Sequence, residues 1–119
     1  MKKIIKKIAI CFSMLIMLVS TSMEASAITM RGWVSCGVWV NDRHTNGWGK
    51  IANLAFVTGF ISGAASVLQI DLLKGVDNNS ITLWVDNYCL ANPLSNTGEA
   101  SDTLGEELIK LHKNEFKSK

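Results

Sequence analysis

The chain has 119 residues, of which 48% are hydrophobic and 18% are charged, and its formal net charge at pH 7 is +2. This length accommodates one small domain and excludes an architecture of two. The positive balance gives no support to nucleic-acid binding, because four of the twelve basic residues lie within the first seven positions, ahead of an apolar run.

The N-terminal 27 residues have the pattern of a secretory signal peptide. MKKIIKK carries four lysines, IAICFSMLIMLVS is a short apolar run, and Ala25 to Ala27 (ASA) match a cleavage site. The run is too short to span a membrane comfortably. We expect cleavage after Ala27, which also removes Cys11. Residues 28–119 then form a single exported domain with eight basic and nine acidic residues, a net charge of about −1.

The spacing of apolar residues predicts a first helix over residues 30–44. Trp33, Cys36, Gly37 and Val40 fall at i, i+3, i+4 and i+7, which places them on one helical face. The NGWG sequence that follows predicts a turn, because Asn-Gly pairs and nearby glycines interrupt helices.

A long apolar helix is expected between Lys50 and Asp71, where the chain carries no charge. Its Gly59-x-x-x-Gly63 spacing would let two helices approach closely in lipid. Polar residues inside the segment make membrane insertion marginal: Asn53, Thr58, Ser62, Ser66 and Gln69. We therefore expect a central core helix that is buried nearly all round, with no stable membrane insertion after signal cleavage.

Two more helices complete the prediction of an all-α fold, a small bundle of about four helices. The DNNS cluster at Asp77 to Ser80 predicts the start of a helix over residues 80–91, which ends at Pro93. The last helix, over residues 99–114, has acidic residues early and lysines late, as the helix dipole favours. The apolar face of the third helix holds Ile81, Trp84, Val85 and Tyr88, and that of the fourth holds Ala100, Leu104, Leu108 and Leu111.

Three roles are open to Cys36 and Cys89, the two cysteines that remain after cleavage. A nucleophile needs a base and electropositive help, and Asp86 would raise rather than lower the pKa of the Cys89 thiol. A zinc site that adds His44 and His112 lacks the paired knuckles of structural zinc sites. One disulfide between the first and third helices fits an exported chain best, and a loop of 53 positions stabilises the fold by roughly 4 kcal/mol.

The remaining residue pattern favours binding over catalysis. The sequence has no paired carboxylates in a shared setting, Gly-rich phosphate loop or Ser-His-Asp order, so we expect a non-enzymatic protein without cofactor or metal. Trp33 and Trp84 are expected in the core around the disulfide. Trp39 and Trp48 fit the core and a contact surface equally well. The candidate partner-binding residues are Trp39, Arg43, Trp48 and Asp86, with the loop over residues 41–46.

Three segments carry a resemblance to known proteins: CGVWVNDR (Cys36 to Arg43), FVTGFISGA (Phe56 to Ala64) and LWVDNYCLANPL (Leu83 to Leu94). With the amphipathic C-terminal helix they resemble small exported bacterial proteins similar to the Tai-type immunity proteins of type VI secretion systems. That resemblance implies a periplasmic, helical, disulfide-bonded protein that blocks a cell-wall amidase by inserting into its cleft. The expected partner is therefore a peptidoglycan-targeting effector protein, and a homodimer is a further expectation.

A looser resemblance is to HdeA-type acid-stress chaperones of the periplasm. It rests on Trp33-x-x-Cys36, a tryptophan just ahead of the first cysteine. It implies a different function, in which acid protonates carboxylates and releases a chaperone-competent monomer. HdeA-type chains lack the DNYC-x-x-NPL segment that is present here.

Overall fold

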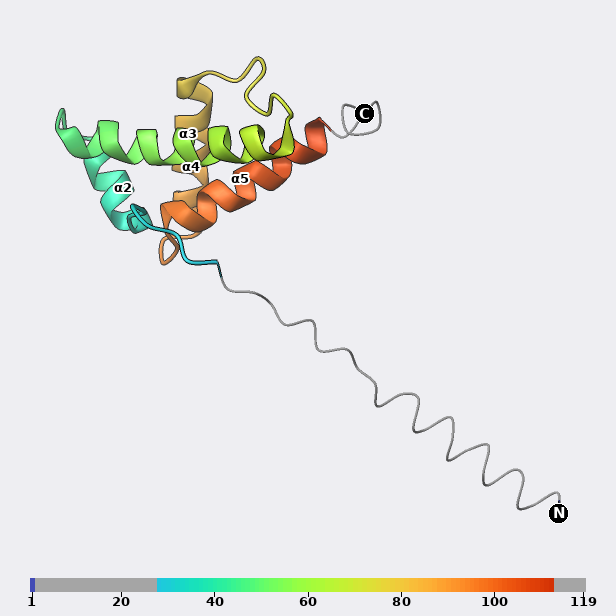
Figure 1. The fold of residues 1–119 in the computed structure, drawn as a ribbon. Helices are drawn as coiled ribbons and strands as arrows, with labels where there is room; N and C mark the ends of the chain where they lie inside the picture. The colour runs from blue at the N-terminus through green and yellow to red at the C-terminus, as the bar shows by residue number, and fades with distance from the viewer. Residues whose placement is uncertain (2–27, 113–119) are drawn as a thin grey trace.

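Four α-helices make up the protein in a computed structural model that describes residue 1 and residues 28–112. They are α2 (Cys36–Arg43), α3 (Trp48–Leu68), α4 (Asn78–Ala91) and α5 (Thr97–Leu111). The predicted all-α fold is confirmed. The predicted signal peptide, Met1 apart, lies outside the described residues. Figure 1 shows α3 lying across α4 and α5, with α2 below the N-terminal end of α3.

The four helices share one hydrophobic core in the described part of the chain. Each helix contributes to it, and the α3–α4 connection adds two residues. The buried apolar side chains are Cys36, Trp39, Val57, Ile61, Ile70, Leu72, Ile81, Val85, Cys89, Ala100, Leu104 and Leu108. A core drawn from every helix is what a chain of this length needs for independent stability.

Helix α2 begins later than the sequence predicts, at Cys36 instead of residue 30. Ser35 caps it, because its hydroxyl accepts a 3.2 Å hydrogen bond from the Val38 N–H. The Cys36 N–H donates 2.9 Å to the carbonyl of Ser95, so the preceding segment is extended beside the α4–α5 connection. Trp33 therefore lies outside the helix and is 49% exposed, which corrects its expected place in the core.

Helix α3 is not the fully buried helix that was expected. Its buried residues are Asn53, Val57 and Ile61, which lie on one side, because the other three helices pack against that side alone. Over its most apolar 18-residue window 17% is buried, although by length and composition the helix could cross a membrane. The Gly59-x-x-x-Gly63 side is exposed. Asn53 is stabilised in the core by donating a 2.8 Å hydrogen bond from Nδ2 to Oδ2 of Asp42 on α2.

Side-chain caps set the beginnings of α4 and α5. The Oδ1 atom of Asp77 accepts 2.7 Å from the Ser80 N–H, and Oδ1 of Asn96 accepts 3.0 Å from the Glu99 N–H. The DNNS cluster caps α4 as predicted, although the helix begins at Asn78, two residues before the predicted start. The backbone hydrogen bond from Ser80 lowers the pKa of Asp77, because it stabilises the charged carboxylate.

Helix α5 buries most of its predicted apolar stripe. Ala100, Leu104 and Leu108 are in the core, together with Ser101, whose hydroxyl donates 2.7 Å to the carbonyl of Thr97. Leu111 was expected to continue the stripe but is 75% exposed, because it is the last residue of the helix. The stripe therefore ends one turn earlier than its spacing suggests.

Candidate functional site

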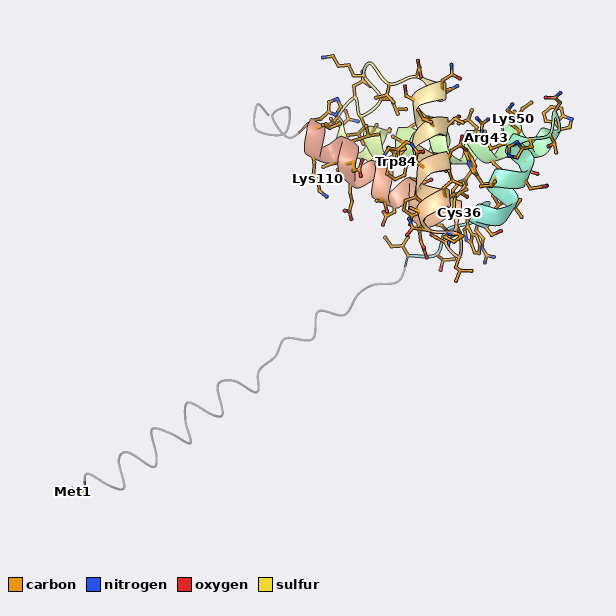
Figure 2. The ribbon with its side chains drawn as sticks, turned by 180° about the vertical axis from the view of Figure 1, so that it is seen from behind. Met1, Cys36, Arg43, Lys50, Trp84 and Lys110 are labelled. Atoms are coloured by element: carbon orange, nitrogen blue, oxygen red, sulfur yellow. A yellow bond between two sulfur atoms is a disulfide. The ribbon has the colours of Figure 1, made fainter. Side chains whose placement is uncertain are left out.

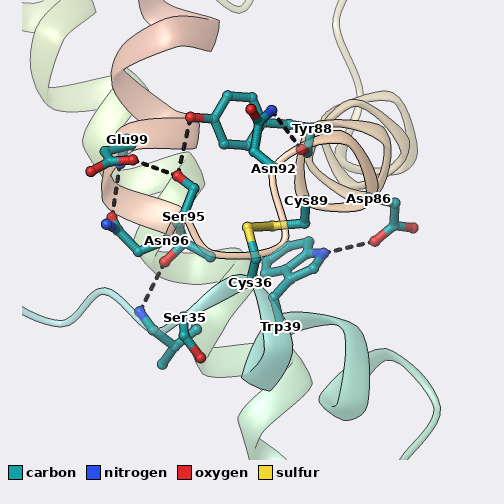
Figure 3. Close-up of a disulfide and its surroundings, with 12 residues drawn as sticks. Ser35, Cys36, Trp39, Asp86, Tyr88, Cys89, Asn92, Ser95, Asn96 and Glu99 are labelled. Carbon is teal, nitrogen blue, oxygen red and sulfur yellow. Dashed lines mark hydrogen bonds between the residues drawn. A yellow bond between two sulfur atoms is a disulfide. The ribbon is translucent and has the colours of Figure 1, made fainter.

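The disulfide joins α2 to α4 as predicted. Cys36 is the first residue of α2, with Arg43 at the other end of that helix (Figure 2). Cys89 lies in the last turn of α4, and the Cα atoms of the two cysteines are 5.0 Å apart. Both side chains are buried. Figure 3 shows the bond between the two helices, next to the α4–α5 connection. Both cysteines therefore have a structural role, of the kind found in proteins of oxidising compartments.

Asp86 lies one helical turn before Cys89 on α4 and makes a second, polar link from α4 to α2. Its Oδ1 atom accepts a 2.7 Å hydrogen bond from Nε1 of Trp39 and a 3.1 Å hydrogen bond from Nε of Arg43. Its Oδ2 atom lies 3.3 Å from the same Arg43 nitrogen. Both donors belong to α2, so one carboxylate and one disulfide hold α2 and α4 together (Figure 3).

Trp39 has a supporting role and does not form a contact surface. Its side chain is 1% exposed, because the indole fills the core between α2 and α4 while its N–H bonds to Asp86. This corrects the expectation that Trp39 contacts a partner. Arg43 and Asp86 are half-buried, with side chains 30% and 28% exposed. Trp48, the first residue of α3, is 82% exposed.

A groove runs over the disulfide along the seam between α2 and α4. It consists of two hollows, of about 350 Å³ and about 260 Å³, that share Val40 and Leu90 in their walls. We call this surface the α2–α4 groove. Its residues are Cys36, Gly37, Val40, Arg43, His44, Asp86, Cys89, Leu90 and Pro93.

The two ends of the α2–α4 groove differ in chemistry. The end at Pro93 is apolar, whereas the other end carries the Arg43 guanidinium and the His44 imidazole. Asp86 accepts from Nε of Arg43, and the terminal guanidinium nitrogens make no hydrogen bond to other described residues. A guanidinium binds a carboxylate through such parallel N–H groups. The groove can therefore receive an apolar side chain beside an acidic group.

Sequence reasoning found the charged end of this groove and missed its apolar walls. Leu90 is 71% exposed and lies four residues after Asp86, so both face the same side of α4. The sequence signal that could have indicated this apolar wall is a leucine outside the predicted buried face of the helix. Val40 was placed on the buried face but is half-buried in the groove wall, whereas His44 belongs to the contact loop predicted over residues 41–46.

Trp84 lies at the edge of the core instead of inside it. Its ring stacks on Tyr88 with centroids 5.5 Å apart, and its Nε1 donates a 2.9 Å hydrogen bond to Oε2 of Glu107 on α5. The Tyr88 hydroxyl lies 3.2 Å from Oγ of Ser95, which donates 2.5 Å to Oε2 of Glu99. These contacts fix α4 against α5 on the side away from the groove.

Comparison with protein-family models, with curated proteins and with solved structures finds no match. Within residues 28–112, no three histidine, cysteine or acidic side chains gather closely enough to hold a metal ion.

Proposed function

We propose that this protein is a periplasmic, non-enzymatic protein-binding domain that acts as an immunity or inhibitor protein against a cell-wall-targeting effector. In this proposal the signal sequence directs export, and the α2–α4 groove receives a segment of the effector. The observation that carries the proposal is the groove itself, with exposed Leu90 and half-buried Val40 beside the partly unpaired guanidinium of Arg43. Exposed apolar anchors beside an arginine are typical of protein contacts.

The fixed geometry of the groove supports the same proposal. Its two walls are joined by the disulfide and by Asp86, which is bonded to Trp39 and Arg43. A groove that is rigid before binding loses little conformational entropy when a partner enters. The covalent and polar links between α2 and α4 would therefore contribute to affinity without touching the partner.

The test measures inhibition of purified peptidoglycan amidase effectors, beginning with any encoded beside this chain. Wild-type protein is expected to inhibit one of them at stoichiometric amounts. Leu90→Lys and Arg43→Ala are each expected to weaken that inhibition by about tenfold or more, which corresponds to the loss of one anchor.

A matched control comes from the same helix. Leu83 on α4 is 61% exposed and does not line the groove, so Leu83→Lys makes the same chemical change outside the proposed site. It is expected to inhibit like wild type. If Leu83→Lys weakens inhibition as much as Leu90→Lys, the groove is not the contact, and if wild type inhibits no amidase effector, the proposed function is wrong.

A further inference from the structure

The connection between α2 and α3 contains an exposed asparagine–glycine pair. The connection consists of residues 44–47, all of them exposed, and forms the loop at the left edge of the bundle in Figure 1. Asn46 is the chain's only asparagine that is followed directly by a glycine, Gly47. Neither residue lines the α2–α4 groove, so this pair is independent of the proposed function.

An asparagine followed by glycine can lose its side-chain amide without an enzyme. The backbone nitrogen of the glycine gives up its proton to solvent and attacks the side-chain carbonyl carbon, Cγ. A new C–N bond closes a succinimide ring, and the side-chain nitrogen takes a proton and leaves as ammonia. Water then opens the ring at either of its carbonyl carbons, which gives aspartate or isoaspartate. In total a water molecule is consumed and an ammonia molecule is released, with no change of oxidation state.

The local structure leaves the Gly47 nitrogen free to react. Its N–H donates no hydrogen bond to any residue in 28–112, and the Asn46 side chain makes none within the same range. Gly47 has no Cβ atom, so no side chain of its own shields the nitrogen. Asn46 lies between the two helices, where helical hydrogen bonds do not fix its backbone. The side-chain carbonyl can therefore rotate to meet the nitrogen.

The other asparagines in the described part of the chain are protected. Asn92 precedes Pro93, whose nitrogen carries no proton. Asn96 precedes Thr97, whose N–H donates a 2.8 Å hydrogen bond to the carbonyl of Val34. The remaining ones lie in helices, whose fixed dihedral angles hold the next backbone nitrogen away from the side-chain carbonyl. They are Asn41, Asn53, Asn78, Asn79 and Asn87.

We propose that Asn46 is a site of spontaneous modification, at which attack by the Gly47 nitrogen converts the asparagine to aspartate and isoaspartate. The co-reactant is water. Each conversion replaces a neutral amide with a carboxylate, so the net charge of the protein becomes more negative by one. Among the described asparagines Asn46 reacts fastest, because exposure, an unfixed backbone and an unhindered nitrogen coincide there.

The two products change the start of α3 in different ways. Gly47 is the N-cap of α3, and within the described chain no side chain caps that helix with a hydrogen bond. Aspartate at position 46 keeps the backbone and places a carboxylate near the free N–H groups of the first turn, where negative charge is favourable. Isoaspartate routes the backbone through its own side chain, which lengthens the connection by a CH₂ group. Ageing of the protein therefore yields two forms of equal charge and different backbone.

Incubation of the exported, oxidised protein at mildly alkaline pH tests the proposal, because base removes the proton from the attacking nitrogen. Peptide mapping by mass spectrometry is expected to find the amide of Asn46 converted before that of any other described asparagine. The intact protein should move to a more acidic form on ion exchange. An isoaspartyl methyltransferase, which methylates isoaspartate and not aspartate, should label the converted protein. If Asn46 keeps its amide as long as the other asparagines do, the proposal is wrong.

Gly47→Ala tests whether the Gly47 nitrogen is the attacking group. An added Cβ atom would lie 3.7 Å from Oγ1 of Thr45, an ordinary contact, and the φ of −93° suits alanine, so the variant should fold like wild type. Its methyl group shields the nitrogen and is expected to slow conversion at Asn46 by about tenfold. Gly37→Ala, at an exposed glycine of α2 that follows no asparagine, is the control and should leave the rate unchanged. Equal rates in wild type and Gly47→Ala would overturn the mechanism.

Unfolding in urea tests the part that the native connection plays. It frees the helical asparagines, so conversion at Asn87 in α4 should rise by about tenfold or more. Asn46 is already free in the native protein, and its rate should change by less than about threefold. If the rate at Asn46 rises on unfolding as much as the rate at Asn87, the native connection restrains the pair and the proposal is wrong.

Discussion

Trp39 and Asp86 are linked by a 2.7 Å hydrogen bond from the indole Nε1 to Oδ1, within the seam between α2 and α4. Because Trp39 is 1% exposed, its N–H loses its hydrogen-bond partner within the protein if the carboxylate is removed. Asp86→Ala is therefore expected to lower the free energy of unfolding by about 2 kcal/mol, since it also releases Arg43. Urea denaturation followed by circular dichroism measures the loss.

Asp86→Asn is the matched comparison, because its amide oxygen still accepts from the indole. We expect it to lose less than half as much stability as Asp86→Ala. Trp39→Phe combined with Asp86→Ala should show a smaller loss than the sum of the two single changes, because each single change removes the same hydrogen bond. Additive losses would mean that the hydrogen bond between Trp39 and Asp86 contributes little.

Removal of either cysteine should have the same effect on stability. Cys36→Ala and Cys89→Ala each open a loop of 53 residues and are expected to lower the free energy of unfolding by about 4 kcal/mol. Chemical denaturation of both variants and of the reduced wild type checks this. If one cysteine had a chemical role, only the change at that cysteine would abolish activity.

The Asp42–Asn53 hydrogen bond should contribute more to the free energy of unfolding than its place near the surface suggests. Asn53 is 6% exposed, and its Nδ2 donates 2.8 Å to Oδ2 of Asp42. Asp42→Ala leaves that buried amide without its acceptor and is expected to cost about 1 to 2 kcal/mol of stability. Asp42→Asn keeps an oxygen at the same position and should cost less; equal losses would contradict this role.

The Asp77 carboxylate is expected to make a contribution to stability that depends on pH. The pKa of its carboxyl is lowered from its ordinary value of 3.8, first by the backbone hydrogen bond from Ser80. A group with a lowered pKa in the folded state stabilises the fold above pH 3.8, and that contribution disappears as pH falls through the lower folded value. Asp77→Asn should flatten the fall in melting temperature between pH 5 and pH 2, and an unchanged profile would contradict the assignment.

The acid-stress chaperone remains a prediction from the HdeA-type resemblance. It expects the protein to suppress aggregation of a client near pH 2 to 3, which light scattering measures directly. If the protein does not protect the client at any ratio of protein to client, this second function is wrong. The inhibition assay with amidase effectors is independent of it.

The helices were predictable where side chains cap or terminate them. Asp77 and Asn92-Pro93 gave the beginning and end of α4 because caps and prolines act within a few residues. The disulfide was predictable too, because two cysteines in an exported chain have few other roles. The start of α2 was not, since it depends on the hydrogen bond between Cys36 and Ser95, which are far apart in the sequence.

Burial was the harder property to read from the sequence. The apolar composition of α3 suggested burial all round, but composition does not say how many neighbours a helix has. Only the side with Asn53, Val57 and Ile61 meets the rest of the described chain. The sequence did not decide whether Trp39 lies in the core or on the surface, because its contact with Asp86 is 47 positions away along the chain.

The disulfide also makes the chain a closed covalent ring from Cys36 to Cys89, with the whole of α3 inside it. Both connections that flank α3, at residues 44–47 and 69–77, belong to this ring. A protease that cuts once in either connection would therefore leave a single covalent molecule, and the two pieces would separate on a gel only after reduction. In a compartment rich in proteases, a nicked copy keeps all four helices tethered.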